Sequence, residues 1–199
     1  GLIIDEIEFR LGSDVNRGAK GYLAILSRKM FGVDGRHIAE FERAGITLKT
    51  IMVHQNGYPR EHMSFPAFKY MGPGSILEEE WESDEEEGAP LIRTQLEQRQ
   101  FCFVVFKKES SGTYLSKVFF WSMPKEDIHR FVKPVWELTR ESILSGTADD
   151  LPGQSFNGVC HIRPHAKNSM DTLVTPHNGM QVRKSFWLDR RYIHDQIGI

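Results

Sequence analysis

Long apolar runs are missing from this chain of 199 residues, although 40% of its residues are apolar. A membrane-spanning helix needs about 18 or more consecutive apolar residues, so the sequence predicts no membrane partner. The first residues, Gly1 to Asp5, include neither an initiator methionine nor the basic-then-apolar pattern of a signal peptide. We therefore expect a piece excised from a longer intracellular protein, although a processed terminus would look the same.

Cysteine is also scarce. Cys102 and Cys160 lie far apart, each within an apolar run typical of a strand, and buried thiols are expected there rather than a disulfide. A zinc site built on Cys160, His161 and His165 would lack a second ligand pair at metal-binding spacing. The sequence thus predicts no metal and no cofactor for this chain.

The net charge is −2, but acidic and basic residues are unevenly distributed along the chain. Residues 78–87, EEEWESDEEE, carry eight acids and no base, which is typical of a solvated loop. The part after residue 155 is basic. Because a polyanion needs a local positive face rather than a positive total, this part is where we look for contacts with DNA.

The order of patterns predicts one α/β (α+β) domain over residues 1–199, in which a mixed β-sheet is flanked by helices and no internal repeat occurs. Residues 19–31 form an amphipathic pattern that ends at Gly32. Residues 100–107 and 113–121 are expected to form a buried strand and its hairpin partner. Residues 124–144 predict one long helix, kinked at Pro134, and residues 181–187 predict the last strand.

One strand carries a signal of nuclease chemistry. In residues 46–53, ITLKTIMV, Thr47 and Lys49 share a face because alternate residues of a strand do so. Metal-dependent nucleases place a carboxylate two residues before such a lysine, and further acids complete the Mg²⁺ cage. Here that position holds Thr47, Glu40 precedes the strand, and the preceding helix carries Arg28. One acid among these four residues cannot bind a divalent cation tightly.

The strand and its flanks resemble the MutH family, endonucleases of the PD-(D/E)xK fold that recognise GATC. The chain is more similar still to the GATC-cutting type II restriction endonucleases of the Sau-three-A type, which have two MutH-like halves. The matching motifs follow in order over nearly the whole chain: MSFPAFK (63–69), EEEWESDEEE (78–87), FCFVVFK (101–107), FFWSMPKEDI (119–128), VKPVW (132–136), CHIRPHAKN (160–168) and KSFWLDRRYI (184–193). They resemble the C-terminal half, which in that family lacks the catalytic acids and binds DNA as an allosteric domain.

The resemblance implies a role for particular residues. The family's metal-binding acids correspond to Glu40, Thr47 and Arg28, so only Lys49 of the catalytic set is retained, and it is expected to reach solvent or pair with Glu40 rather than contact phosphate. Arginine suits guanine and asparagine suits adenine through paired hydrogen bonds, and basic residues suit phosphates. The resemblance therefore implies DNA contacts by Arg163, His165, Lys167, Asn168, Arg183, Lys184 and Ser185. Gln181 stands where the family has a DNA-facing aromatic residue.

Three functions remain open. The favoured one is a catalytically inert, GATC-binding effector domain that binds double-stranded DNA and promotes cleavage by the N-terminal catalytic domain of the same enzyme, in the bacterial cytoplasm. Mg²⁺ would then serve that catalytic domain only. The second is an active Mg²⁺-dependent endonuclease that uses Glu40 with Glu42 or Asp34, although Glu42 is poorly placed two residues from Glu40. The third is a structural domain for homodimerisation without affinity for DNA.

Overall fold

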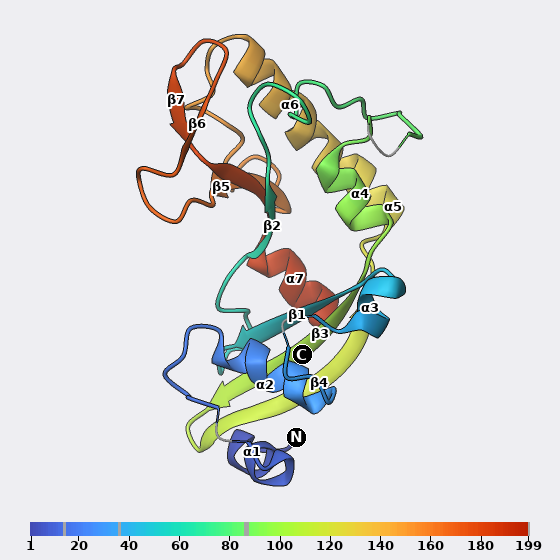
Figure 1. Cartoon of the computed structure of the whole chain (residues 1–199), viewed down its shortest axis with the longest axis vertical. Coiled ribbons are helices and arrows are strands. Elements are labelled where there is room, and N and C mark those ends of the chain that lie inside the picture. Colours follow the sequence, from blue (N-terminus) through green and yellow to red (C-terminus); the bar gives the residue numbers. More distant parts are fainter. Residues whose placement is uncertain (14, 36, 86–87, 199) are drawn as a thin grey trace. The chain divides into compact units, whose positions relative to one another are not determined.

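The computed structural model describes residues 1–13, 15–35, 37–85 and 88–198. Strand β3 (Gln100–Glu109) is buried continuously from Phe101 to Phe106, as expected for a strand covered on both faces. It pairs in parallel with β1 (Ile46–Val53) and antiparallel with β4 (Gly112–Trp121), so the strand order is β1-β3-β4 (Figure 1). The predicted strand and its hairpin partner are confirmed.

Three helices accompany this mixed sheet: α1 (Ile4–Leu11), α2 (Tyr22–Met30) and α3 (Ala39–Arg43). Ile7 and Leu26 from the first two helices pack against Val104 and Phe106 of β3 in one apolar cluster. Helix α2 ends where Gly32 adopts φ 73°, a left-handed conformation that glycine tolerates because it has no Cβ. The amphipathic pattern predicted around α2 is thereby confirmed, with the helix shorter at both ends.

A second group of strands forms an antiparallel sheet in the order β2-β8-β5. These strands are β2 (Met63–Ala67), β5 (Cys160–Pro164) and β8 (Lys184–Leu188). A separate hairpin joins β6 (Thr172–Val174) to β7 (Met180–Val182). Helices α4 (Leu91–Glu97), α5 (Lys125–Asp127), α6 (Lys133–Leu144) and α7 (Arg190–Ile197) belong to the same part of the chain.

Packing divides the chain into two compact units, residues 1–61 with 99–122 and residues 62–98 with 123–198. The strands therefore belong to separate small sheets instead of the one mixed sheet that the sequence predicts, while the mixed α/β character is confirmed. The expectation of one domain over 1–199 stays a prediction. Within the described residues, no helix combines the length and the apolar character that crossing a bilayer requires.

The helix predicted over residues 124–144 contains a π-helical turn, η1 (Ile128–Val132), directly before α6. Pro134 explains this turn, because proline has no amide hydrogen and its ring collides with the carbonyl four residues earlier. A wider turn removes that collision without ending the helix. The irregularity predicted at Pro134 thus takes the form of a π-helical turn.

The last predicted strand is interrupted at Arg183, which separates β7 from β8. The amide of Arg183 donates to the carbonyl of Asp171 at 3.0 Å, and its Nε lies 3.0 Å from the Asp171 carboxylate. These bonds turn the backbone away from a continuous strand. A local pattern cannot reveal the break because the partner, Asp171, lies twelve residues upstream.

Candidate functional site

A pocket of about 530 Å³ lies between α2 and β1 in the first unit. Arg28 from α2 and Thr47 and Lys49 from β1 all line it, so the structure brings three of the four predicted catalytic positions together. Ser27 Oγ and Thr50 Oγ1, 3.1 Å apart, link the same helix and strand. The remaining described lining residues are Ala24, His37, Ile38, Phe41, Glu42, Ile46, Leu48, Thr50 and Arg99.

The charged side chains that line this pocket are mainly basic. Burial lowers the pKa of Lys49 from its ordinary 10.5 to about 8, because a charged ammonium loses hydration there. Arg28 and Arg99 add two permanent positive charges. Glu42 is the acid among the described lining residues, and its carboxylate contacts His37 Nδ1. Such a donor set suits an anion better than a hard divalent cation.

The acids considered for a rebuilt metal site occupy different surroundings. Glu40 is absent from the described pocket lining and lies 3.4 Å from Arg43. Asp34 is 90% exposed and lies 3.1 Å from Lys29. Glu42, by contrast, lines the pocket, while the expectation that it is poorly placed to share a metal with Glu40 stays a prediction. A turn of α3 presents it to the pocket, which spacing from Glu40 alone does not reveal.

Arg163 and His165 project from the end of β5 in the second unit, and both are exposed. The Trp187 ring of neighbouring β8 contacts each of them: the Arg163 guanidinium lies 5.6 Å from its centroid, and the His165 ring packs edge-on at 5.4 Å. His165 Nδ1 also lies 3.0 Å from the Phe65 carbonyl oxygen. These contacts hold the two side chains in defined positions at the surface.

Lys167 and Asn168 lie on the exposed turn that follows. The amide of Lys167 donates to Asp171 Oδ2 at 3.0 Å, and Asn168 Oδ1 accepts from the amide of Met170 at 2.9 Å. The side-chain oxygen of Asn168 therefore shapes the turn, while the Lys167 ammonium stays at the surface. Met170 is 85% exposed on the same turn, and sequence reasoning missed it because a lone methionine carries no surface signal.

The other three predicted DNA contacts are more engaged within the protein. Arg183 pairs with Asp171. Lys184 Nζ donates to the Ala148 carbonyl at 3.1 Å, and burial lowers its pKa. Ser185 is fully buried, and its hydroxyl finds no hydrogen-bond partner among the described residues. Ser185 lies on β8, the central strand of the β2-β8-β5 sheet, between its register partners Ala67 and Arg163. Because its side chain is fully covered, a direct contact with DNA is not available to it in this conformation.

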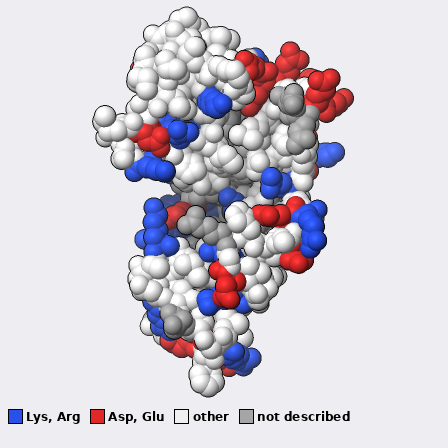
Figure 2. Space-filling model, in the orientation of Figure 1, with Lys and Arg blue, Asp and Glu red and all other residues white. Residues whose placement is uncertain are grey.

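The acidic run is not solvated throughout, contrary to the expectation of a solvated loop, because Glu79 is half-buried and bonded within the protein. Glu79 accepts the Trp136 indole N–H at 2.7 Å and the Leu91 amide at 3.0 Å, and burial raises its pKa. Trp81 is also buried. The exposed acids of the run gather on the surface beside α4 and α6 (Figures 1 and 2), so the run both anchors α4 and presents negative charge.

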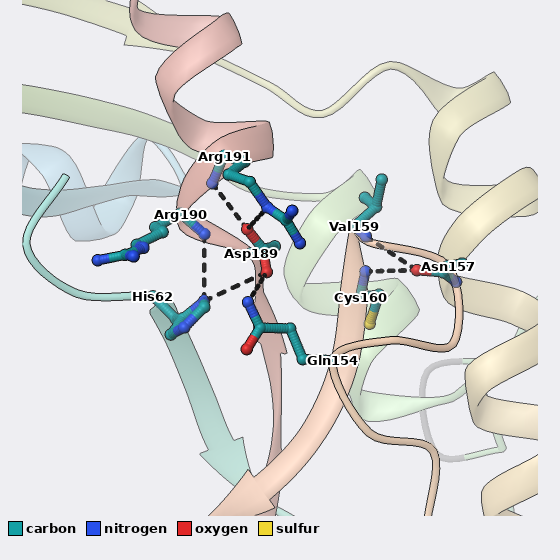
Figure 3. Close-up of polar contacts among 8 residues, drawn as sticks. All are labelled: His62, Gln154, Asn157, Val159, Cys160, Asp189, Arg190 and Arg191. Carbon is teal, nitrogen blue, oxygen red and sulfur yellow. Dashed lines mark hydrogen bonds and ion pairs between the residues drawn. The ribbon is translucent and has the colours of Figure 1, made fainter. Parts of the chain in front are cut away.

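A further cluster joins His62, His161 and Asp189, whose candidate ligand atoms all lie within 4.8 Å of one another. Asp189 is fully buried, caps α7 through the Arg191 amide at 2.8 Å and accepts from Gln154 Nε2 at 2.7 Å (Figure 3). This cluster shares His161 with the set Cys160, His161 and His165 that was considered from the sequence, but its other two members are different. Sequence reasoning missed His62 and Asp189 because the three residues are far apart along the chain.

Comparison with known proteins gives one relevant relative. The chain is 27% identical, over 227 aligned positions, to the type II restriction enzyme Sau3AI of Staphylococcus aureus. The alignment covers 92% of this chain and 46% of that enzyme, so the chain spans less than half the length of the curated relative it matches. No family model matches. The predicted resemblance to Sau-three-A-type restriction endonucleases is confirmed, and its assignment to one half stays a prediction.

Proposed function

We propose that this chain is a DNA-binding effector domain of a two-part type II restriction endonuclease, with a MutH-like PD-(D/E)xK fold whose metal site is degenerate. In this function the domain binds a GATC duplex without cutting it. A separate N-terminal catalytic domain of the same enzyme, served by Mg²⁺ in the bacterial cytoplasm, performs the cleavage. The domain itself uses no cofactor in that reaction.

The observation that carries this proposal is the pocket shared by Arg28, Thr47 and Lys49. A nuclease of this fold needs two or three carboxylates beside its lysine to hold Mg²⁺. Arginine and threonine at two of those positions supply a positive charge and a neutral hydroxyl instead. Because like charges repel, Mg²⁺ would bind weakly next to Arg28 and Lys49, whereas DNA phosphates would be attracted.

The surface around the end of β5 supports binding to DNA. Arg163, His165 and Lys167 are exposed there. The Trp187 ring contacts the Arg163 and His165 side chains. A rigidly held guanidinium suits the paired acceptors of guanine in the major groove. Arg183 and Lys184 lie beside this surface but already bind protein groups, so they suit phosphate positioning more than base reading.

The effector role rests on the length of the alignment. The chain accounts for 46% of its restriction-enzyme relative, which leaves room for a catalytic domain in a parent enzyme. Promotion of cleavage requires that DNA binding favour one of two states of that enzyme. A homodimer that brings two sites together is a further arrangement compatible with looping of DNA.

The test is a gel shift of the 199-residue chain with a GATC duplex and a scrambled duplex, each with and without EDTA. The proposal expects preference for GATC that the chelator does not change, together with no nicking of either duplex in Mg²⁺. Arg130→Ala is a matched control for arginine substitutions on the β5 surface, because Arg130 is likewise exposed but belongs to another element, η1. Absence of binding at low salt contradicts the proposal and favours a structural dimerisation domain.

A second candidate, an active Mg²⁺-dependent endonuclease, draws on the position of Glu42 in the pocket. Glu42 with Glu40 would have to bind the metal beside Lys49. This candidate expects Mg²⁺-dependent nicking that Glu42→Gln abolishes. Nicking that survives Glu42→Gln would be assigned to a contaminating nuclease.

A further inference from the structure

A buried histidine with no partner points to an unassigned site in the second unit. His161 is fully buried on β5, and neither of its ring nitrogens has a hydrogen-bond partner within the described part of the chain. A neutral imidazole carries one donor and one acceptor, and leaving both unsatisfied in the interior costs free energy. A native protein usually compensates such a group with a bound ion or an ordered water.

The groups around His161 are ligands for a transition metal. The His62 ring packs edge-on against the His161 ring with centroids 4.9 Å apart. His62 Nδ1 lies 3.7 Å from Asp189 Oδ2, and candidate ligand atoms of all three residues lie within 4.8 Å of one another. Ligands of a tetrahedral zinc ion lie about 3.4 Å apart, so small side-chain rotations would bring these three into place.

We propose that His62, His161 and Asp189 form a binding site for a divalent transition-metal cation of the zinc class. Two imidazoles and one carboxylate make a donor set that binds Zn²⁺ in preference to Mg²⁺. The fourth position of a tetrahedral ion stays open to water. This site is separate from the pocket lined by Lys49 and does not depend on the proposed effector function.

The protonation states of the three residues suit a metal. Burial lowers the pKa of His161 to about 4 and also lowers the pKa of His62, so both rings are neutral at pH 7 and offer a lone pair. Burial by itself raises the pKa of Asp189, but hydrogen bonds from the Arg191 amide, Gln154 and the Arg191 side chain outweigh it and leave the pKa lowered. The carboxylate is therefore ionised.

Supporting contacts hold the ligands from behind. Asp189 Oδ2 accepts from Gln154 and Oδ1 accepts from the Arg191 amide, so the carboxylate is oriented by groups that are not ligands (Figure 3). Such outer hydrogen bonds commonly tune metal sites. His62 Nδ1 accepts from the Arg190 amide at 3.1 Å, and a metal bound at Nδ1 would replace this bond.

Nearby positive charges oppose the cation. Arg163, Arg190 and Arg191 all act electrostatically on His62, and one carboxylate offsets only part of their charge. Affinity is therefore set by the balance between good ligands and a basic surrounding. The zinc concentrations tested should reach the micromolar range for this reason.

The position of the ligands gives the metal a structural role. His62 directly precedes β2, His161 lies on β5, and Asp189 follows β8 as the cap of α7. A bound ion would tie all three strands of the β2-β8-β5 sheet, two residues from Arg163. Because no two ligands are neighbours in sequence, the site exists only in the folded sheet, and the metal should stabilise the fold by binding it selectively.

The test is a titration of the untagged, chelator-treated 199-residue chain with Zn²⁺ in competition with a chromophoric chelator, without DNA. We expect one Zn²⁺ per chain and a higher melting temperature with Zn²⁺. Co²⁺ in its place should give the intense visible bands of four-coordinate nitrogen and oxygen ligation. His161→Gln and Asp189→Asn should each weaken binding by at least about tenfold, and Asp189→Asn keeps a residue that caps helices. His177→Ala, which removes an exposed histidine of the same unit, should change nothing.

If a variant fails to fold, the proposed metal site can still be tested with the wild-type protein alone. In a spectrum of ¹⁵N-labelled histidines, Zn²⁺ should shift the ring signals of His62 and His161 and leave His177 unchanged. Absence of Zn²⁺ binding at micromolar concentrations overturns the proposal. Binding that shifts other histidines, or that Asp189→Asn leaves intact in a folded protein, overturns it equally. These outcomes test only the metal site and leave the proposed DNA-binding function untested, because no DNA is present in the experiment.

Discussion

Replacing Lys49 with methionine should make this protein more stable at neutral pH. Burial lowers the pKa of Lys49 from 10.5 to about 8. At about 1.4 kcal/mol for each pH unit, the charged ammonium costs the folded state about 3 kcal/mol relative to an unfolded chain in water. Methionine has a similar length, no charge and a flexible side chain that fills irregular space, so Lys49→Met should recover up to about 3 kcal/mol.

The pH dependence provides an independent check of the cause. Between pH 8 and 10.5 the unfolded lysine still holds its proton while the folded one has released it, so the unfolded state binds more protons and stability rises with pH. Below pH 8 Lys49 is protonated in both the folded and the unfolded state, so the full free-energy cost of burying its charge is present. The difference between Lys49→Met and wild type should therefore be largest at neutral pH and disappear by about pH 10.5.

Urea denaturation of both proteins across this pH range measures the effect. Lys108→Met is the matched control, since Lys108 is exposed on neighbouring β3 and its replacement should change stability by less than about 0.5 kcal/mol. A Lys49→Met protein that is no more stable than wild type, or a difference that stays constant with pH, would refute the reasoning from burial. A gel shift with the same variants then separates a bystander lysine, which leaves DNA affinity unchanged, from a phosphate contact.

Four further substitutions test the proposed DNA surface, the Lys49 pocket and the acidic run. Arg163→Ala should cost about 1–3 kcal/mol of binding to GATC duplex and little to a scrambled one; equal losses in competition gel shifts would assign Arg163 to phosphate. Lys184→Ala should weaken both duplexes alike and reduce the salt dependence of binding by about one unit of slope, whereas a lower melting temperature alone would mean a purely structural role. Thr47→Ala should leave DNA affinity within about 0.5 kcal/mol of wild type, which the same assay measures. Burial raises the pKa of Glu79, so its stabilising contribution is present below pH 4.5 and is lost as pH rises; Glu79→Gln should abolish this loss in pH-dependent urea denaturation, and an unchanged profile would contradict it.

The strands of the first unit could be predicted because their signals are local. The continuous apolar run of β3 and the alternating pattern of β4 are complete within about ten residues each, and the short turn between them leaves a hairpin as the simplest connection. The shared face of Thr47 and Lys49 follows from strand geometry alone. Their place beside Arg28 in one pocket also needed α2, and this was expected only through the family resemblance.

Features that depend on distant partners were not predictable from patterns. The break at Arg183 depends on Asp171, and the half-buried position of Glu79 depends on Trp136, 57 residues along the chain. Ser185 looks like a surface residue beside two basic neighbours, yet it is buried on the central strand of a sheet whose other two strands come from distant parts of the chain. The His62, His161 and Asp189 cluster is the extreme case, since pairing of three strands is required before its members meet.

Under the proposed function, a basic residue in place of an acid weakens Mg²⁺ binding at the Lys49 pocket and at the same time favours DNA phosphates. Carboxylates that hold Mg²⁺ also repel DNA phosphates when no metal is bound, so a nuclease active site built from them needs the ion for binding as well as for cleavage. A pocket with Arg28 and Lys49 but few acids does not have that repulsion. Under the proposed function, such a domain should bind a duplex in the presence of a chelator, because an effector has to stay bound to DNA while a second domain cuts. Binding to a DNA duplex that a chelator does not weaken is therefore the physical property that the proposed effector function requires.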